Sequence, residues 1–217
     1  MNTAVLIHCP LFQGIPPDRI ETILKRLSAK TQHFEKNEYI FQAEDPAGSI
    51  GIVLTGEAHV LREDYWGNRS ILTLITAGDM FGEAFACAGA AHLPVGVIAA
   101  GNTHILFIKY QKIITDCAPS CPYHNQLIQN MLQIIAQKNI MLTQKMEHIA
   151  KKSIREKLLS YLSFTAVQSG SDHVRIPFNR QELANYLNVD RSALSRELSR
   201  MQEEGLLQYK GCDFRLL

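Results

Sequence analysis

The stretch "FNRQELANYLNVDRSALSRELSRMQEEGLL", residues 178–207, decides the fold of the C-terminal part of the chain. Asn179 and Glu182, three positions apart, form a capping box, which predicts the start of a helix. Asn188 stands where a tight turn needs a positive φ, a conformation that asparagine tolerates better than most residues. Asp190 is a typical N-cap, so a second helix is expected to begin directly after it. The stretch therefore predicts two helices joined by a short turn.

The second predicted helix has two chemically different faces. Leu194, Leu198 and Met201 recur at i, i+4 and i+7, which indicates a core face, and Ala184 is small where the first helix must cross closely. A solvated helix face usually mixes Glu and Lys, whereas the opposite face here is rich in Arg and Ser. Arg reads guanine with two hydrogen bonds, and Ser can bond bases or phosphates. The face consists of Arg191, Ser192, Ser195, Arg196 and Ser199.

The segments on either side extend this helical pair. "HVRIP" (173–177) is typical of a strand, and "GLLQYKGCDFRLL" (205–217) predicts a hairpin that turns at Lys210-Gly211. Two helices, a short turn and a hairpin wing favour a DNA-binding winged helix-turn-helix over an ordinary helical pair.

Residues 34–110 show a different pattern. "SIGIVLTGEAHVLRED" (49–64), "RSILTLITAGDMF" (69–81) and "VGVIAAGNTHILFIKY" (95–110) are β-rich runs separated by glycine-containing turns. Several short strands with regular turn signals predict an antiparallel sandwich or barrel. The run from Ala84 to Ile108 lacks charged residues and is long enough to raise a transmembrane interpretation. Its Gly, Pro, His and Asn content favours a short helical turn followed by two buried strands.

A long helix is predicted to start near Pro122. Its apolar positions are spaced 4, 3, 4, 3, 4 and 3, a coiled-coil seam over about three heptads. One seam position is Asn139, and a single buried asparagine commonly sets register in a two-stranded coil. We expect a parallel dimer helix; the alternative is a helix packed on its own barrel through Leu127, Met131, Ile134 and Met141. The seam comprises Ile128, Leu132, Ile135, Asn139, Leu142, Met146 and Ile149.

Composition and charge are those of an ordinary globular protein. The 217 residues are 46% hydrophobic and 20% charged, with a net charge of +1. Residues 1–150 hold 11 basic and 13 acidic residues, against 11 and 8 in residues 151–217, so the C-terminal part is mildly basic. Without a signal-peptide pattern, and with only five cysteines, a cytoplasmic protein with free thiols and no membrane partner is expected. No nucleophile–base pair or phosphate loop predicts an enzyme, so no catalytic residue is expected.

Together "GDMFGEAF" (78–85), the long helix and "NRQELANYLNVDRSALSREL" (179–198) resemble the Crp/Fnr superfamily of bacterial transcription regulators, the cyclic-AMP receptor protein type, over nearly the full length. The resemblance implies an α+β chain of three parts. These are a cyclic-nucleotide-binding-type antiparallel β-barrel (a double-stranded β-helix) that senses an effector at 1–121, a dimerisation helix at 122–149, and a winged helix-turn-helix DNA-binding domain at 150–217. It also implies a homodimer that reads palindromic double-stranded DNA and contacts RNA polymerase. The pause at "AKKS" (150–153) is the expected hinge.

The resemblance also implies roles for single residues. Arg191, Ser192, Ser195 and Arg196 match base-reading positions of the recognition helix, and Arg180 and Gln181 match positions that touch phosphates. Several relatives have Glu where this chain has Ser192, so the preferred half-site is expected to differ.

The turn that binds the cyclic phosphate in nucleotide-binding relatives departs from their pattern. In those relatives an Arg-Ser or Arg-Thr pair follows the turn, and the Arg neutralises the phosphate; here the two positions are Leu93 and Pro94. No Arg lies between Arg69 and Arg155, and no Lys between Arg69 and Lys109. Because a buried phosphate without a cationic partner is costly, cyclic AMP is not expected to bind. Glu83 is then structural or bonds another ligand.

Three effectors remain open, beside simple packing of the Cys and His residues. The first is a small organic ligand in a pocket of Phe81, Gly82, Glu83, Phe85, Leu93, Pro94, Val95 and Val97. The second is redox or metal chemistry, including an iron–sulfur cluster, at Cys117, Cys121 and His124, a spacing that is not a tight zinc signature. The third is heme, with His92, Cys87, His8 and Cys9 as candidate ligands. An alternative function for the whole chain is a cyclic-nucleotide-type barrel that serves as a regulatory protein–protein docking module.

Overall fold

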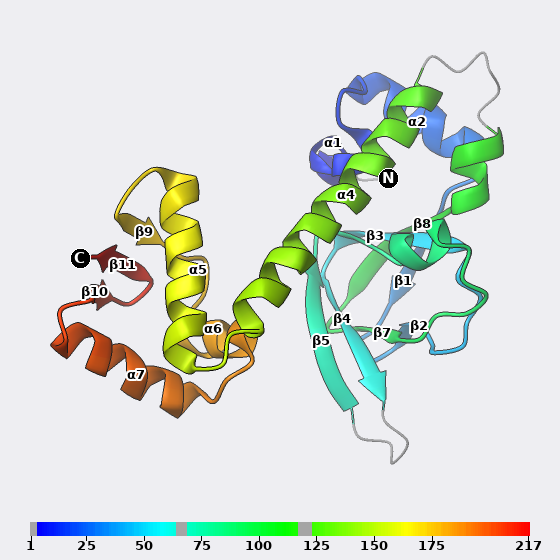
Figure 1. Ribbon diagram of the computed structural model, residues 1–217. Coiled ribbons are helices and arrows are strands. Elements are labelled where there is room, and N and C mark those ends of the chain that lie inside the picture. The colour runs from blue at the N-terminus through cyan, green and yellow to red at the C-terminus, as the bar shows by residue number, and fades with distance from the viewer. Residues whose placement is uncertain (1–3, 64–68, 117–122) are drawn as a thin grey trace. The chain divides into compact units, whose positions relative to one another are not determined.

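The computed structural model describes residues 4–63, 69–116 and 123–217 (Figure 1). The chain divides into two compact units, Met1–Ala136 and Gln137–Leu217, and the division falls within the long helix α4 (His124–Ile149). No helix within the described ranges is both long enough and apolar enough to cross a membrane.

The first unit contains two four-stranded antiparallel sheets, as the sequence predicts. One sheet has the order β1-β8-β3-β6 and the other β2-β7-β4-β5. The uncharged run forms α3, β7 and β8 rather than a membrane span. The strands are β1 (Lys30–Phe34), β2 (Tyr39–Phe41), β3 (Ser49–Thr55), β4 (Glu57–Glu63), β5 (Arg69–Thr76), β6 (Met80–Phe81), β7 (Gly96–Ala99) and β8 (Thr103–Lys109), with helices α1 (Ala4–His8), α2 (Pro17–Arg26) and α3 (Glu83–Cys87).

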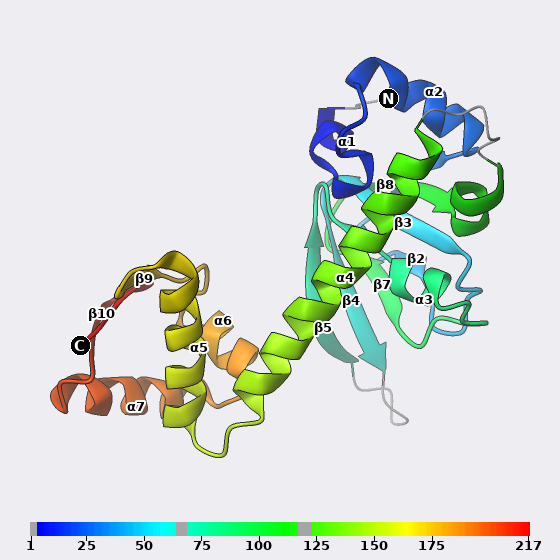
Figure 2. The same cartoon turned by 45° about the horizontal axis from the view of Figure 1, so that its top comes forward.

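Successive side chains along the strands point to opposite faces of the sheets, and the two faces contribute to two separate cores in this unit. On β3, Ile50 and Ile52 face a core shared with α2 and the start of α4, whereas Val53 belongs to the core between the two sheets. Figures 1 and 2 show α1, α2 and the start of α4 gathered on one side of the strands. The N-terminal helices and α4 thus cover one sheet, and the inner core is filled by side chains of both sheets.

A hydrogen-bonded asparagine ties α4 to the N-terminal segment. The amide nitrogen of Asn130 donates to the carbonyl oxygens of Leu11 at 2.9 Å and Gln13 at 2.8 Å. Asn130 is buried, so these bonds satisfy an amide that would otherwise be costly to remove from water.

The second unit contains the end of α4, three further helices and a small sheet. The helices are α5 (Ile154–Ser169), α6 (Arg180–Leu187) and α7 (Arg191–Glu203). The antiparallel sheet has the order β10-β11-β9, from β9 (His173–Arg175), β10 (Leu207–Lys210) and β11 (Asp213–Leu216), and lies beside α5 in Figures 1 and 2. The predicted hairpin is confirmed, but its turn lies one residue later than expected, at Gly211-Cys212, since Lys210 still pairs with Asp213.

Candidate nucleic-acid interface

Capping residues define where α6 begins and ends and where α7 begins. At α6, Asn179 Oδ1 accepts the N–H of Glu182 at 3.0 Å, and Glu182 Oε2 accepts the N–H of Asn179 at 2.7 Å. Asn188 ends the helix in the left-handed conformation, with φ of 52° and ψ of 59°. The predicted capping box and turn are both confirmed, and they fix where the second helix departs.

A two-part cap begins α7. Asp190 Oδ1 accepts the N–H of Ala193 at 2.8 Å and the hydroxyl hydrogen of Ser192 at 2.5 Å. The Ser192 hydroxyl, followed by the Ala193 N–H, holds the pKa of the Asp190 carboxyl below its usual value. The Ser192 hydroxyl therefore completes the cap, while its oxygen lone pairs stay available to accept a hydrogen bond from a base or a bound water.

The core face and the exposed face of α7 lie as the sequence predicts. Leu194, Leu198 and Met201 are fully buried against the α6 side chains, where Ala184 is also fully buried. Arg191, Ser192, Arg196 and Ser199 are exposed, and Ser195 is half-buried. Neither Arg191 nor Arg196 is ion-paired within the part of the chain that the structure describes. Two guanidinium groups on one helix face are therefore available to an anionic partner.

An ion-pair network joins α5 to the C-terminal half of α7 and neutralises two acidic side chains there. Arg155 on α5 donates from Nε to Glu197 Oε1 at 2.6 Å, and from Nη1 and Nη2 to the two carboxylate oxygens of Glu204 at 2.7 and 2.9 Å. These bonds, led by the one to Glu204, raise the pKa of Arg155 and lower that of Glu204 from its usual 4.5. The Arg155–Glu204 pair therefore stabilises the folded state above the usual pKa of Glu204. This stabilisation is lost as the pH falls through the lowered pKa.

Sequence reasoning missed this network, because its partners lie 42 and 49 residues apart and no local pattern links them.

The predicted phosphate-contact residues occupy the start of α6. The Arg180 guanidinium lies over the Tyr209 ring at 4.9 Å and 5.7 Å from the Phe214 ring centre, which joins α6 to the wing by cation–π contacts. Gln181 is exposed, and its amide nitrogen donates to Asn185 Oδ1 at 3.0 Å.

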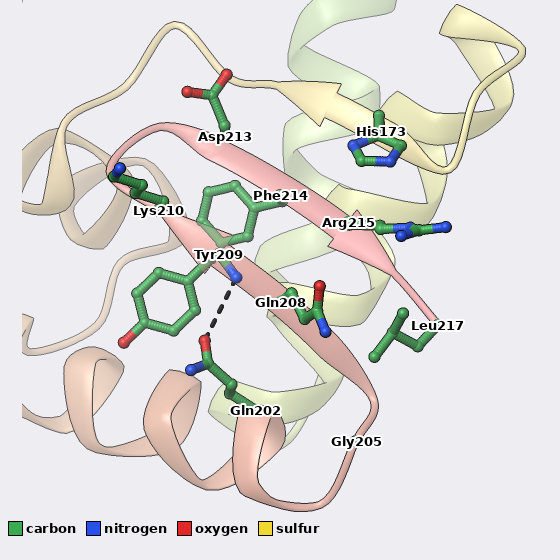
Figure 3. Close-up of a pocket in the computed structure, with 10 residues that line it drawn as sticks. All are labelled: His173, Gln202, Gly205, Gln208, Tyr209, Lys210, Asp213, Phe214, Arg215 and Leu217. Carbon is green, nitrogen blue, oxygen red and sulfur yellow. Dashed lines mark hydrogen bonds between the residues drawn. The ribbon is translucent and has the colours of Figure 1, made fainter.

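The wing is fastened to the end of α7. Figure 3 shows Tyr209 and Phe214 side by side on the hairpin, with Lys210 near its turn. The Tyr209 N–H donates to Gln202 Oε1 at 3.3 Å, the dashed line in Figure 3. This hydrogen bond joins the hairpin, on which Lys210 is exposed, to the end of α7. Lys210 is a candidate phosphate contact that the sequence analysis did not single out.

The seam of α4 is largely exposed in the single chain. Leu132, Leu142 and Met146 are 65%, 61% and 65% exposed, Asn139 is exposed, and Ile128, Ile135 and Ile149 are half-buried. The barrel-packing alternative holds for Leu127, Met131 and Ile134, which are buried, but it is wrong for Met141, which is 66% exposed. Exposed apolar side chains at coiled-coil spacing are typical of a helix that lacks its partner.

The residues of the predicted effector pocket belong mainly to packed structure. Phe81, Glu83, Leu93 and Val95 are buried, Phe85 is half-buried, and Pro94 is exposed. The Leu93 N–H donates to the Asp45 carbonyl at 2.9 Å, and its carbonyl accepts the Glu44 N–H at 2.8 Å. Leu93, which the family resemblance matches to the position of the phosphate-binding arginine, is apolar and 2% exposed.

The candidate metal and heme ligands do not converge where they can be placed. Cys117 and Cys121 lie outside the described residues, and His124 begins α4. Among the residues that the structure does describe, no three His, Cys, Asp or Glu side chains are grouped to hold a metal ion. Of the heme candidates, His92 bonds through Nδ1 to the Glu44 carbonyl at 2.8 Å. His8 lies at the end of α1, and burial raises the pKa of the Cys9 and Cys87 thiols.

Comparison with known proteins agrees with this geometry. Residues 31–116 match the family described as the cyclic nucleotide-binding domain, and residues 156–217 match the Crp-like helix-turn-helix domain. The chain is 26% identical over 215 residues to the probable transcriptional regulator flp of Lacticaseibacillus casei, covering 96% of this chain and 91% of that protein. It is 23% identical over 205 residues to the transcriptional activator protein FnrA of Stutzerimonas stutzeri, covering 92% and 80%.

Solved structures share the fold. The c-di-GMP responsive global regulator CLP of Xanthomonas campestris matches with a TM-score of 0.57 and 18% identity, over 90% of this chain and 98% of that one. DNR of Pseudomonas aeruginosa matches with a TM-score of 0.52 and 19% identity, over 100% and 94%. With both domain families matched in order and full-length relatives that regulate transcription, the chain belongs to the Crp/Fnr superfamily and is a DNA-binding transcription regulator with a helix-turn-helix.

Proposed function

We propose that the chain acts as a homodimer that binds a palindromic DNA site and is controlled by an effector other than a cyclic nucleotide. The observation that carries the DNA-binding part is the exposed Arg and Ser face of α7, with Arg191 and Arg196 free of ion pairs among the described residues. In a symmetric dimer the two recognition helices reach successive major grooves about 34 Å apart. RNA polymerase is the protein partner that the family resemblance implies.

The three parts of the chain take distinct roles in this proposal. The barrel of residues 1–121 receives the signal, the helix of 122–149 pairs two copies through the exposed α4 seam, and residues 150–217 bind DNA. An effector can switch DNA binding only if it prefers one of two dimer arrangements, and the segment 150–153 between α4 and α5 is the proposed hinge.

The DNA test is a titration of a palindromic duplex and a scrambled duplex at several salt concentrations, with the palindrome obtained by selection from a random DNA pool. We expect tight binding to the selected palindrome and a steep fall in affinity with salt, because each phosphate contact releases counterions. A chain that instead serves as a protein-docking module through its barrel would bind neither duplex in a salt-dependent manner.

Cyclic AMP is expected not to bind. After the turn at Gly82-Glu83, this chain has Leu93 and Pro94 at the positions where nucleotide-binding relatives have an arginine and a hydroxyl residue. A bound cyclic phosphate would therefore be desolvated without a cationic partner. Calorimetry should show no saturable heat with cyclic AMP in the micromolar range. Saturable binding would refute the proposed effector class while leaving the DNA-binding role intact.

The chemical nature of the effector is a separate question from DNA binding. A visible absorption spectrum of protein purified without oxygen separates the alternatives. A Soret band points to heme, and a broad sulfur-to-iron band points to a cluster at Cys117 and Cys121. A spectrum without either band favours a small organic ligand in the barrel.

A further inference from the structure

A cavity of about 350 Å³ opens in the barrel beside β1, β2 and β8, and residues outside the family's nucleotide-binding turn line it. Lys30 and Gln32 of β1 line it together with Phe107 and Lys109 of β8. Lys30 pairs directly with Phe107 in the antiparallel register. The two β1 residues are two positions apart, and so are the two β8 residues. All four side chains therefore lie on the face of the sheet that carries the buried inner-core residue Ile105.

The lining carries an excess of positive charge. Lys30 and Lys109 are diagonal neighbours across the β1–β8 pair, a placement that brings long side chains within reach of each other. Asp45 is the one acidic residue in the lining, and its Oδ2 already accepts the Gln42 N–H at 2.7 Å. Neither lysine forms an ion pair with any residue that the structure describes. Two ammonium groups and one carboxylate leave the cavity suited to a monoanion.

Two phenylalanine rings line the cavity. Phe41 and Phe107 meet edge to face, with ring centres 5.5 Å apart, and both are only half-buried. Their neighbours Phe34 and Phe81 continue the aromatic row into the buried core, with ring centres 6.1 and 5.7 Å from their partners. Half-exposed rings beside cations favour a ligand that covers the rings and neutralises the ammonium groups together.

We propose that this cavity binds a small aromatic carboxylate. The carboxylate lies between the ammonium groups of Lys30 and Lys109, and the ring covers Phe41 and Phe107. The cations come from β1 and β8, so the site needs no basic residue in the uncharged run from Ala84 to Ile108.

The site has a direct structural link to the dimerisation helix. Ile108 precedes Lys109 on β8 and points to the opposite face of the strand, where it shares a core with Leu127 and Met131 of α4. A ligand on one face of β8 and the start of α4 on the other thus contact the same strand. An effect of the bound ligand on α4, and so on dimerisation, rests on the proposed function. Binding of the ligand in the cavity does not.

The test is calorimetry on the full chain without DNA, with four probes: benzoate, phenyl phosphate, benzyl alcohol and acetate. We expect saturable benzoate binding and much weaker binding of the neutral alcohol and of ringless acetate. Lys30→Gln and Lys109→Gln should each weaken benzoate binding about tenfold, the usual effect of losing a charge-assisted hydrogen bond. Asp45→Asn should tighten it several-fold, since asparagine can still accept the Gln42 N–H while a negative charge is removed.

Lys36→Gln is the matched control, because Lys36 is exposed and absent from the lining. Both cavity lysines are also exposed, so their variants should keep the melting temperature of the parent protein. Benzoate binding that is absent, or unchanged in both lysine variants, would overturn the site. Equal binding of benzyl alcohol or acetate would overturn the aromatic-anion assignment, and a preference for phenyl phosphate would overturn the carboxylate. All of these outcomes leave DNA binding untouched, so they are distinct from a failure of the proposed function.

Discussion

Arg196→Ala is expected to abolish specific DNA binding while leaving the protein folded and its oligomeric state unchanged. Arg196 lies on the exposed face of α7 and is not ion-paired within the described ranges, so its removal disturbs no contact of the core. A bidentate Arg–guanine contact contributes about 1–3 kcal/mol of discrimination. A symmetric dimer loses two such contacts, and we expect affinity for the selected palindrome to fall roughly 100-fold or more.

The matched control for this experiment is Arg175→Ala. Arg175 is an exposed arginine of β9, away from α7, so this variant has the same change in net charge without touching the recognition helix. Both variants should be titrated with the palindrome and with a scrambled duplex. Arg196→Ala should reduce the difference in affinity between the palindrome and the scrambled duplex, whereas Arg175→Ala should preserve this difference. Full palindrome affinity in the Arg196 variant would remove Arg196 from the base-reading set.

The parts of the fold that were predictable are those written in short-range sequence patterns. The α6 capping box, the left-handed Asn188 and the Asp190 cap each join residues within a few positions, so the sequence alone identifies both partners. The exposed α4 seam likewise follows from a simple period. Such patterns state which residues begin a helix or share a face.

The features that were not predictable join residues far apart in the chain. Asn130 bonds to carbonyls 119 and 117 positions away, and Arg155 reaches Glu197 and Glu204 across the second unit. A period shows which face of an element is apolar but not which element lies opposite it. The pairing of Lys30 with Phe107 depends on strand register, which the sequence leaves open over such a separation. The sequence alone therefore does not show that Lys30 and Lys109 are diagonal neighbours across the β1–β8 pair.

Leu142→Asp is expected to break the dimer. Leu142 occupies a seam position of α4 and is 61% exposed in the single chain, so the change leaves the core of the monomer intact. In a parallel two-stranded coil the two copies of this position face each other across the symmetry axis. Two carboxylates would then be buried without cationic partners, at a cost of several kcal/mol, and the dimer dissociation constant should rise by roughly 1,000-fold. Analytical ultracentrifugation across a concentration series measures this shift.

Gln137→Asp and Asn139→Leu make the seam assignment specific. Gln137 is exposed on the same helix, on the side opposite the seam, so its aspartate variant has the same added charge and should remain dimeric. Asn139→Leu should strengthen the dimer, because a polar residue in a coiled-coil core lowers stability while it sets register. Since one monomer can hold only one half-site, the Leu142 variant should also lose palindrome affinity, with recovery at concentrations that restore the dimer. A Leu142 variant that stays dimeric would place the interface on another surface, and equal dissociation of the Gln137 variant would trace the effect to charge on α4 rather than to the seam.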